Sequence, residues 1–557
     1  MIVFFAQYDC SQRYLVLMHI KTMKNHSSAF PDVAMPAYPA TNLHNDPVIV
    51  ADAASAVVQT RCGKVSGYIR KGIFTFKGIP YGEAKRFMSA VKPASWENVR
   101  SCLAYGPTCP TTQAPDFTEE LEFAFQPNRG YHVDEQCLTL NIWSKSTDSN
   151  AKKPVMVWLH GGGFANGSAI EFPSQDGENL ARNGDVVLVS LNHRMNVLGF
   201  LDLSAYAEKY KHSCNAGMMD IVLALQWVHE NIANFGGDPG NVTIFGQSGG
   251  GSKVMCLMNA PSAKGLFQKA IVQSGSYPNH FTDKNVSRKV AAALLEELKI
   301  DPKNVEALET MPYEQLAHAG TAALAKVQAA MSPQEVPVLG LEWNPVLDDE
   351  FLPYQIGSSV AAALSADIPL LVGSVKNEFV PFEMDLRKVA NKDAQAILLE
   401  KYADQTDAYI NALKIAYPGV KEPSELIDID FLFRPLVIDQ ANKKFADGGA
   451  PVYTYLFTWQ SPVLDKSLRA VHCMDLPFVF DNIALCEQMT GGGEQAHILA
   501  QKISQAWVHF AYTGNPNHTT LPSWPAYNPE NGAVMLFDHE CVVKNHPDKA
   551  LLRISAK

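Results

Sequence analysis

The chain has 557 residues, of which 47% are hydrophobic, 10% aromatic and 18% charged. This much apolar material is enough for a large core, and it excludes a mostly disordered or low-complexity protein. The formal net charge of -11 offers no basic footprint, which argues against nucleic acid and anionic membrane surfaces as partners. No apolar run reaches the roughly 18 to 20 residues of a spanning helix, so we expect no membrane span.

The N-terminal segment lacks a regular pattern and contains further methionines at Met18, Met23 and Met35. We therefore expect residues 1–56 to be an irregular tail or an overextended start. Residues 57–557 contain no internal repeat and no linker rich in Pro, Gly or Ser, which predicts one large domain. No convincing signal peptide is recognised, and the sequence leaves both a cytoplasmic and a secreted location open.

Short β-prone runs begin the predicted domain at 57–61 and 63–69, and the glycine between them favours antiparallel hairpins. Three later runs are apolar almost throughout, which is typical of strands buried on both faces. These runs are 138–143, 154–159 and 186–191. A helical pattern over 218–231 then precedes a strand-like run at 241–245, and this alternation indicates parallel crossover units. The predicted fold class is α/β, with a large, mostly parallel central sheet flanked by helices.

The second half of the chain continues the same alternation with longer helical stretches. Strand-like runs occur at 269–273, 368–373 and 452–459. The segments between them are helical in pattern, which predicts two helical insertions in one sheet. A terminal helix is expected after these runs, because four apolar residues fall on one helical stripe: Leu499, Ile503, Trp507 and Phe510.

The first chemical signal is the G-x-S-x-G sequence around Ser248, which directly follows the strand-like run 241–245 and precedes an apolar segment, 253–258. A nucleophile on a sharp strand-to-helix turn has strained backbone angles, and the residues two before and two after it crowd together. Gly246 and Gly250 meet that requirement. The pattern in this context predicts that Ser248 is a catalytic nucleophile, although a structural turn would also use these residues.

The second signal is the run from His160 to Gly163, which consists of a histidine and three glycines and directly follows the buried strand 154–159. Acyl-transfer enzymes need backbone N–H groups here to meet a developing oxyanion, and glycine lets a substrate oxygen approach the backbone closely. A flexible loop is the alternative, but background usage of these residues makes such a run rare.

Together these motifs resemble those of the type-B carboxylesterase and lipase family of the α/β-hydrolase fold, which includes the cholinesterases. The resemblance covers nearly everything after about residue 56, including further landmarks at 76–82, 134–143 and 234–239. It implies that the backbone N–H groups of Gly162, Gly163 and Gly249 form an oxyanion hole.

A serine hydroxyl needs a base to take its proton and a carboxylate to orient that base. In this fold the chain order is Ser, then Asp or Glu, then His, with the acid after a late strand. Glu378 follows the run 368–373 and occupies the family's acid position. Of the six histidines after Glu378, only His472 follows a predicted strand in a polar loop, and it resembles the family's base. Phe379 and Cys473 stand where the family commonly has glycine.

The remaining departures from the family pattern concern the substrate. Cholinesterase-like members have glutamate before the nucleophile and a tryptophan in the loop ending at the cysteine that matches Cys137, whereas this chain has Gln247 and no Trp between Cys109 and Cys137. Choline esters are therefore not expected as substrates. The same loop carries phenylalanines that could line an apolar entrance or pack the core: Phe117, Phe123 and Phe125.

Cys109 and Cys137 resemble the family's first disulfide pair. They would be bridged in a secreted protein and would be two buried thiols in a reducing cytosol. The sequence leaves both states open.

From the residues and the resemblance we expect a serine hydrolase that cleaves neutral, fairly apolar carboxylic esters through an acyl-enzyme on Ser248. His472 acts as the base and Glu378 as its orienting acid, with no cofactor and no metal. An amidase or lactonase using the same triad is one alternative, because the pocket rather than the triad sets the leaving group. A non-catalytic adhesion protein of the same fold is another, and retention of all three triad residues argues against it.

Overall fold

The computed structural model describes residues 48–111, 117–276, 281–338 and 340–555. Most of the predicted N-terminal tail, 1–47, lies outside these residues. Ile49–Val50 of that predicted tail form strand β1, which pairs antiparallel with β4 (Tyr68–Arg70). Residues 48–557 form one structural unit.

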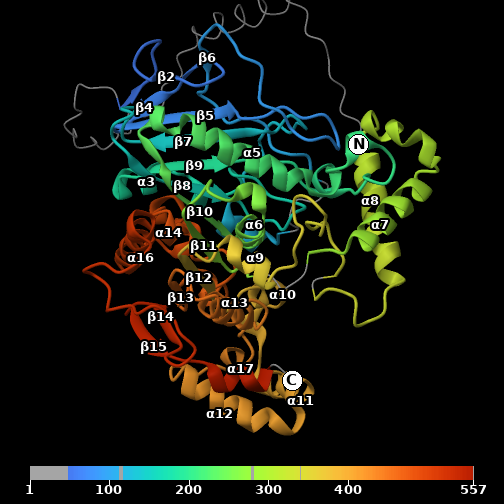
Figure 1. The fold of residues 1–557 in the computed structure, drawn as a ribbon. Helices are drawn as coiled ribbons and strands as arrows, with labels where there is room; N and C mark the ends of the chain where they lie inside the picture. The colour runs from blue at the N-terminus through green and yellow to red at the C-terminus, as the bar shows by residue number, and fades with distance from the viewer. Residues whose placement is uncertain (1–47, 112–116, 277–280, 339, 556–557) are drawn as a thin grey trace, which may run out of the picture. The chain divides into compact units, whose positions relative to one another are not determined.

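A twelve-stranded sheet runs through this unit (Figure 1). In spatial order after β1 and β4, the strands are β5 (Ile73–Pro80), β7 (Thr139–Ser144), β9 (Val187–Leu191), β8 (Lys153–Leu159), β10 (Gly237–Gln247), β11 (Lys269–Gln273), β12 (Leu370–Val375), β13 (Val452–Phe457), β14 (Ala533–Phe537) and β15 (Val542–Asn545). In this order the strands from β9 to β14, β8 included, are parallel to one another, and the strands at both edges pair antiparallel. The α/β-hydrolase expectation of a large parallel sheet is confirmed.

A smaller sheet precedes the large one in the chain. It contains β2 (Val57–Gln59), β3 (Lys64–Ser66) and β6 (Arg100–Ser101). β2 and β3 pair antiparallel, as the glycine-separated runs predict, and β6 adds to β3 in parallel.

The core lies on both faces of the large sheet, because alternate side chains of each strand point to opposite faces. In β8, Val155 and Val157 belong to the core on one face, while Met156 and Trp158 belong to the core on the other. All four side chains are fully buried. This double burial explains why the predicted central strands are apolar almost throughout.

Helices connect the strands and cover the sheet (Figure 1). The first half of the chain contains α2 (Glu119–Phe125), α3 (Glu178–Gly184), α4 (Asn196–Phe200), α5 (Ala216–Asn231) and α6 (Gly249–Met258). The helical pattern predicted over 218–231 is α5. In the part of the chain that the structure describes, no helix has the length and apolar character needed to cross a lipid bilayer.

Two helical insertions interrupt the sheet after β11, as the sequence predicts. The first contains α7 (Lys284–Glu297), α8 (Tyr313–Ala329) and α9 (Ser359–Leu364). The second, between β12 and β13, contains α10 (Val380–Glu383), α11 (Asn391–Tyr402), α12 (Thr406–Ala416) and α13 (Arg434–Ala446).

The C-terminal region differs from the sequence prediction. After α14 (Leu476–Val479) and α15 (Glu487–Thr490), helix α16 (Glu494–Thr513) buries the predicted apolar stripe. This helix does not end the fold, because β14, β15 and α17 (Lys549–Ser555) follow it. β14 pairs in parallel with β13, far earlier in the chain, and in an antiparallel hairpin with β15, so the sequence analysis missed a local signal, the apolar run 533–537.

Candidate active site

Ser248 lies on a strained turn between β10, which ends at Gln247, and α6, which begins at Gly249. Its backbone angles, φ 57° and ψ -130°, are in a region that L-residues rarely adopt. A Cβ on Gly246 would lie 2.4 Å from the Gly250 carbonyl carbon, and one on Gly250 would lie 2.0 Å from the Leu159 oxygen. Both positions therefore require glycine, as the sequence argument predicts.

Glu378 and His472 lie in contact in the segments that follow the neighbouring strands β12 and β13. The Nδ1 of His472 donates to Glu378 Oε2 at 2.6 Å, and the Val375 N–H donates to Glu378 Oε1 at 3.1 Å. The His472 N–H also donates to the Glu378 carbonyl at 2.8 Å. Glu378 is fully buried, and burial raises the pKa of its carboxyl, an effect that the hydrogen bond from His472 opposes.

Ser248 and His472 line the same pocket. Among the described residues, the Ser248 hydroxyl has no hydrogen-bond partner, and the side-chain amide nitrogen of Gln247 lies 3.2 Å from His472 Nε2. Hydrogen bonds between nucleophile and base are often long or absent before substrate binds. The arrangement brings the three predicted triad residues together, with the Ser248–His472 bond not yet formed.

The glycine run after β8 faces the same pocket. Gly162 and Gly163 have positive φ values of 83° and 58°, and a Cβ on Gly249 would lie 2.4 Å from the Gly163 nitrogen. The N–H groups of these three glycines donate to no residue that the structure describes. They are therefore free to bind an oxygen atom of a ligand.

Lys253, on α6, is a residue that the sequence argument missed. Its side chain is fully buried, and its ammonium Nζ donates to the His160 carbonyl oxygen at 2.8 Å. Burial lowers the pKa of Lys253 to about 7, and nearby Glu171 opposes this effect. In the sequence, Lys253 stands out as the single charged residue of the apolar segment 253–258. This pattern marks the residue but does not tell which group it contacts.

The pocket has a volume of about 500 Å³ and an aromatic wall. We call this wall the phenylalanine wall: it consists of Phe117, Phe125, Phe172, Phe379, Phe382 and Phe433. The sequence left open whether the phenylalanines near α2 line an entrance or pack the core. Phe117 and Phe125 line the pocket, whereas Phe123 is 51% exposed and does not.

The other histidines after Glu378 have different partners. His518 Nε2 contacts the Lys502 carbonyl oxygen at 2.9 Å, and His546 Nε2 contacts the Glu530 carbonyl oxygen at 3.0 Å. His497 and His509 lie on α16, and His539 follows β14. Of the histidines in the described parts of the chain, only His472 makes a hydrogen bond with the Glu378 carboxylate.

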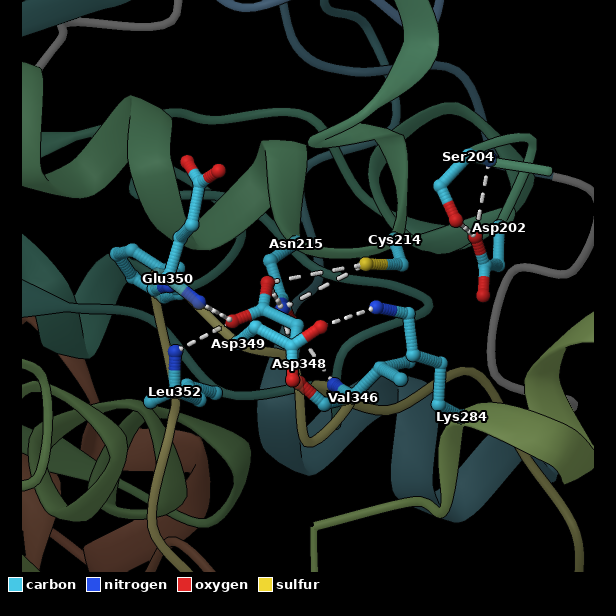
Figure 2. A network of polar contacts seen from close by, with 11 residues as sticks. Asp202, Ser204, Cys214, Asn215, Lys284, Val346, Asp348, Asp349, Glu350 and Leu352 are labelled. Carbon is cyan, nitrogen blue, oxygen red and sulfur yellow. Dashed lines mark hydrogen bonds and ion pairs between the residues drawn. The ribbon is translucent and has the colours of Figure 1, made fainter. Parts of the chain in front are cut away.

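Two acids that precede Glu378 in the chain, Asp348 and Asp349, belong to a separate network (Figure 2). Asp348 accepts hydrogen bonds from the Asn215 side chain at 2.8 Å and from the Leu352 N–H at 2.8 Å, while Asp349 pairs with Lys284 at 3.0 Å. This network ties the first helical insertion to the start of α5. It does not involve His472.

Cys109 and Cys137, for which the sequence left two states open, are both buried free thiols in the structure. A hydrogen bond with Cys109, together with burial, raises the pKa of the Cys137 thiol well above its usual range.

Comparisons with known proteins find esterases that match this chain over most of its length. The model of the carboxylesterase family matches residues 54–554. The para-nitrobenzyl esterase of Bacillus subtilis is 36% identical over 88% of this chain and 96% of its own length. Phenmedipham hydrolase of Pseudarthrobacter oxydans is 32% identical over 87% of this chain and 95% of its own length. A solved esterase of Clostridium hathewayi, described as hydrolysing aliphatic aromatic polyesters, superposes with a TM-score of 0.80 and 38% identity, covering 91% of this chain and 99% of that one.

Proposed function

The chain belongs to the carboxylesterase family and is a carboxylic-ester hydrolase, and we propose that Ser248 is its nucleophile, His472 its general base and Glu378 the acid that orients the base. The observation that carries this proposal is the 2.6 Å hydrogen bond between His472 and Glu378, in a pocket that also contains Ser248 on a strained turn.

In the proposed acylation step, Ser248 Oγ attacks the ester carbonyl carbon while His472 Nε2 takes the hydroxyl proton. The carbonyl oxygen becomes an oxyanion and binds the free N–H groups of Gly162, Gly163 and Gly249. When the tetrahedral intermediate collapses, the bond to the alcohol oxygen breaks and His472 gives the alcohol its proton.

Deacylation repeats the sequence with water. His472 takes a proton from water, the hydroxide attacks the acyl carbon, and the same glycine N–H groups bind the second oxyanion. The acid is then released as the proton returns from His472 to Ser248 Oγ. Throughout, Glu378 keeps Nδ1 protonated and stabilises the imidazolium.

We further propose that the substrates are neutral, fairly apolar esters. The phenylalanine wall supplies apolar contacts, and Gln247 beside the nucleophile carries no charge. Two glutamates also line the pocket, and burial raises the pKa of both, that of Glu171 to about 7. Raised pKa values reduce the negative charge that a cationic substrate would need. The esterases among the relatives do not favour amide cleavage, lactone cleavage or a non-catalytic role.

The test of the nucleophile is covalent labelling with a fluorophosphonate probe, located by peptide mass spectrometry. We expect the label on Ser248 in the wild type and none in Ser248→Ala, because only an activated hydroxyl attacks such a probe quickly. Ser252→Ala is the matched control: this serine lines the same pocket, but its hydroxyl donates to the Gly275 carbonyl at 3.1 Å. Labelling of Ser252, or of no serine in folded protein, would contradict the assignment.

A further inference from the structure

Three residues at which this chain departs from the family pattern surround His472. The Phe379 ring lies 4.4 Å from the imidazole, measured between ring centroids. The side-chain amide of Gln247 lies over the same imidazole, and Cys473 is the next residue after His472 in the chain. On a further side, the Phe433 ring stacks on the imidazole at 5.6 Å with an interplanar angle of 10°. The three residues that differ from the family pattern therefore all lie next to one side chain, that of His472.

Gln247 and Cys473 also contact each other. The Cys473 thiol donates to Gln247 Oε1 at 3.2 Å, while the amide nitrogen of Gln247 lies 3.2 Å from His472 Nε2 and 3.4 Å from Nδ1. Gln247 is buried, so the amide has few other partners available. Burial raises the pKa of the Cys473 thiol well above its usual range, which keeps it protonated and able to donate at neutral pH.

The donors and acceptors around His472 fix the direction of these bonds. Glu378 accepts from Nδ1, so in the neutral ring Nδ1 carries the proton and Nε2 is an acceptor. The amide nitrogen of Gln247 is almost equally distant from the two ring nitrogens, so its NH₂ group lies over the ring between them and leaves the Nε2 lone pair open to Ser248. With the amide turned the other way, its oxygen would face the ring, and the thiol would lose its acceptor. The thiol therefore selects the orientation in which the NH₂ group faces the base.

This orientation distinguishes the two protonation states of His472. When the ring becomes an imidazolium, the amide NH₂ that faces it brings the positive end of its dipole toward a cation and offers no acceptor. A neighbour that opposes the charged form favours the neutral form.

We propose that Gln247 and Cys473 form a pair of positioning residues that holds His472 as a neutral base in the free enzyme and extends activity toward acid pH. The proposal rests on the proposed role of His472 as base. We call these two residues the amide–thiol pair. The pair acts through His472 and takes no part in bond making.

Other charged groups face this site from neighbouring segments. Glu378 bonds to the imidazole, and Asp475 accepts from Gln273 at 2.9 Å and from Tyr455 at 3.1 Å. Asp430 accepts from the Phe379 N–H at 3.0 Å, and Glu171 lines the pocket. These groups are unchanged in variants of the amide–thiol pair, so differences between such variants report on the pair.

The experiment measures kcat/KM and the rate of fluorophosphonate labelling of Ser248 from pH 5 to 9. Cys473→Ala frees the amide to turn its oxygen toward the imidazolium, and we expect the acid limb of both profiles to move up by about half a pH unit. Gln247→Glu places an anion beside the imidazolium, and the acid limb should move up by about one pH unit. Cys473→Ser retains a donor to Oε1 and should keep the wild-type profile.

Combining the substitutions provides a second criterion. A carboxylate presents an oxygen to the ring in either orientation, so Cys473→Ala should add little in the Gln247→Glu background. Cys486→Ala is the control for loss of a thiol, because Cys486 is buried next to α15 and, among the described residues, forms no hydrogen bond with His472 or Gln247, so its loss should leave the profile unchanged.

An acid limb that does not move in folded Cys473→Ala, or a serine variant that behaves like the alanine variant, would overturn the amide–thiol pair. Failure of the proposed function has a different signature, which is the absence of labelling at Ser248 in the wild type at every pH. Full additivity of the two substitutions would also count against the pair, because the thiol would then act independently of the amide.

Discussion

Glu378 and Asp348 are both buried carboxylates, but their oxygens have different partners. Glu378 accepts from the His472 ring and from one backbone N–H. Asp348 accepts from three successive backbone N–H groups, those of residues 350 to 352, and from Asn215 (Figure 2). His472, a partner of Glu378, lines the pocket, whereas the backbone partners of Asp348 close a turn in the first helical insertion.

This difference predicts opposite consequences for the two isosteric substitutions. Glu378→Gln should lower kcat by roughly 10³ to 10⁴-fold, because a neutral amide neither stabilises the imidazolium nor fixes its tautomer. Asp348→Asn should leave kcat unchanged and lower the free energy of unfolding by about 1–3 kcal/mol, because one hydrogen bond to Asn215 is lost. Steady-state kinetics and thermal unfolding of both variants provide the check. Wild-type turnover in Glu378→Gln would require another acid.

Lys253 is the second residue whose environment makes a specific prediction. Its lowered pKa, about 7 in the folded protein against 10.5 for the unfolded chain, means that the unfolded state binds more protons between these values. The free energy of unfolding should therefore rise with pH over this window, by an amount on the order of 2 kcal/mol between pH 7 and 9.

Lys253→Met lacks this contribution, so its unfolding free energy relative to wild type should fall as pH rises from 7 to 9. The variant also leaves the His160 carbonyl without its donor, and we expect kcat to fall by about tenfold as the adjoining glycine run loses support. Lys444→Met is a matched control, because Lys444 also donates to backbone carbonyls, those of Ser365 and Ala366, but not in the pocket. A pH-independent stability difference in Lys253→Met would contradict the expectation.

The element that matters most for the pocket is the turn from β10 to α6. Its geometry depends on the close approach of α6 to the end of β8, where Gly250 meets the Leu159 carbonyl. Packing at this distance admits no side chain, because a Cβ would have to displace backbone atoms rather than a flexible side chain.

Gly250→Ala should therefore move α6 away from β8, lower the free energy of unfolding by at least about 2 kcal/mol and abolish most activity. Gly419→Ala is the matched control, because a Cβ there meets no atom within 4 Å and the residue has no positive φ. Thermal unfolding and kcat are the measurements. A fully active Gly250→Ala variant would mean that the turn tolerates a different geometry.

At the scale of the whole molecule, the pocket is assembled from segments that are far apart in the chain. Phe125 comes from α2, Phe172 from the region before α3, Phe382 from α10 and Phe433 from the start of α13. Their rings contact one another, with Phe125 and Phe382 centroids 5.7 Å apart. Substrate preference is therefore a property of the assembled helical insertions and the sheet together.

Two phenylalanines of α2 allow the effect of the phenylalanine wall on substrate preference to be distinguished from an effect on stability. Phe125→Ala should lower kcat/KM for hexanoyl esters by about tenfold and for acetyl esters by much less, because the longer chain loses an apolar contact. Phe123→Ala should change neither value, since this side chain is 51% exposed and outside the pocket. The ratio of kcat/KM for the two esters in each variant is the measurement. An unchanged ratio in Phe125→Ala would place this ring outside the substrate path.

Local patterns in the sequence were sufficient for the α/β fold, for the turn at Ser248 and for its flanking glycines. The reason is that a strand, a sharp turn and a helix follow each other directly there, and steric crowding within five residues restricts their identity. Burial on both faces likewise marks β8 and β9 in the sequence. Glu378 and His472 were selected because each follows a predicted strand and because each stands at the position that the family resemblance gives to the acid or the base.

Only the tertiary structure decided which distant residues meet. Gln247 and Cys473 are 226 positions apart, and their contact depends on how β10 and the segment after β13 are placed side by side. The bond from Lys253 to the His160 carbonyl and the pairing of β14 with β13 have the same origin. Such contacts are fixed by packing across the sheet rather than by local backbone preference, so no short stretch of sequence carries their signal.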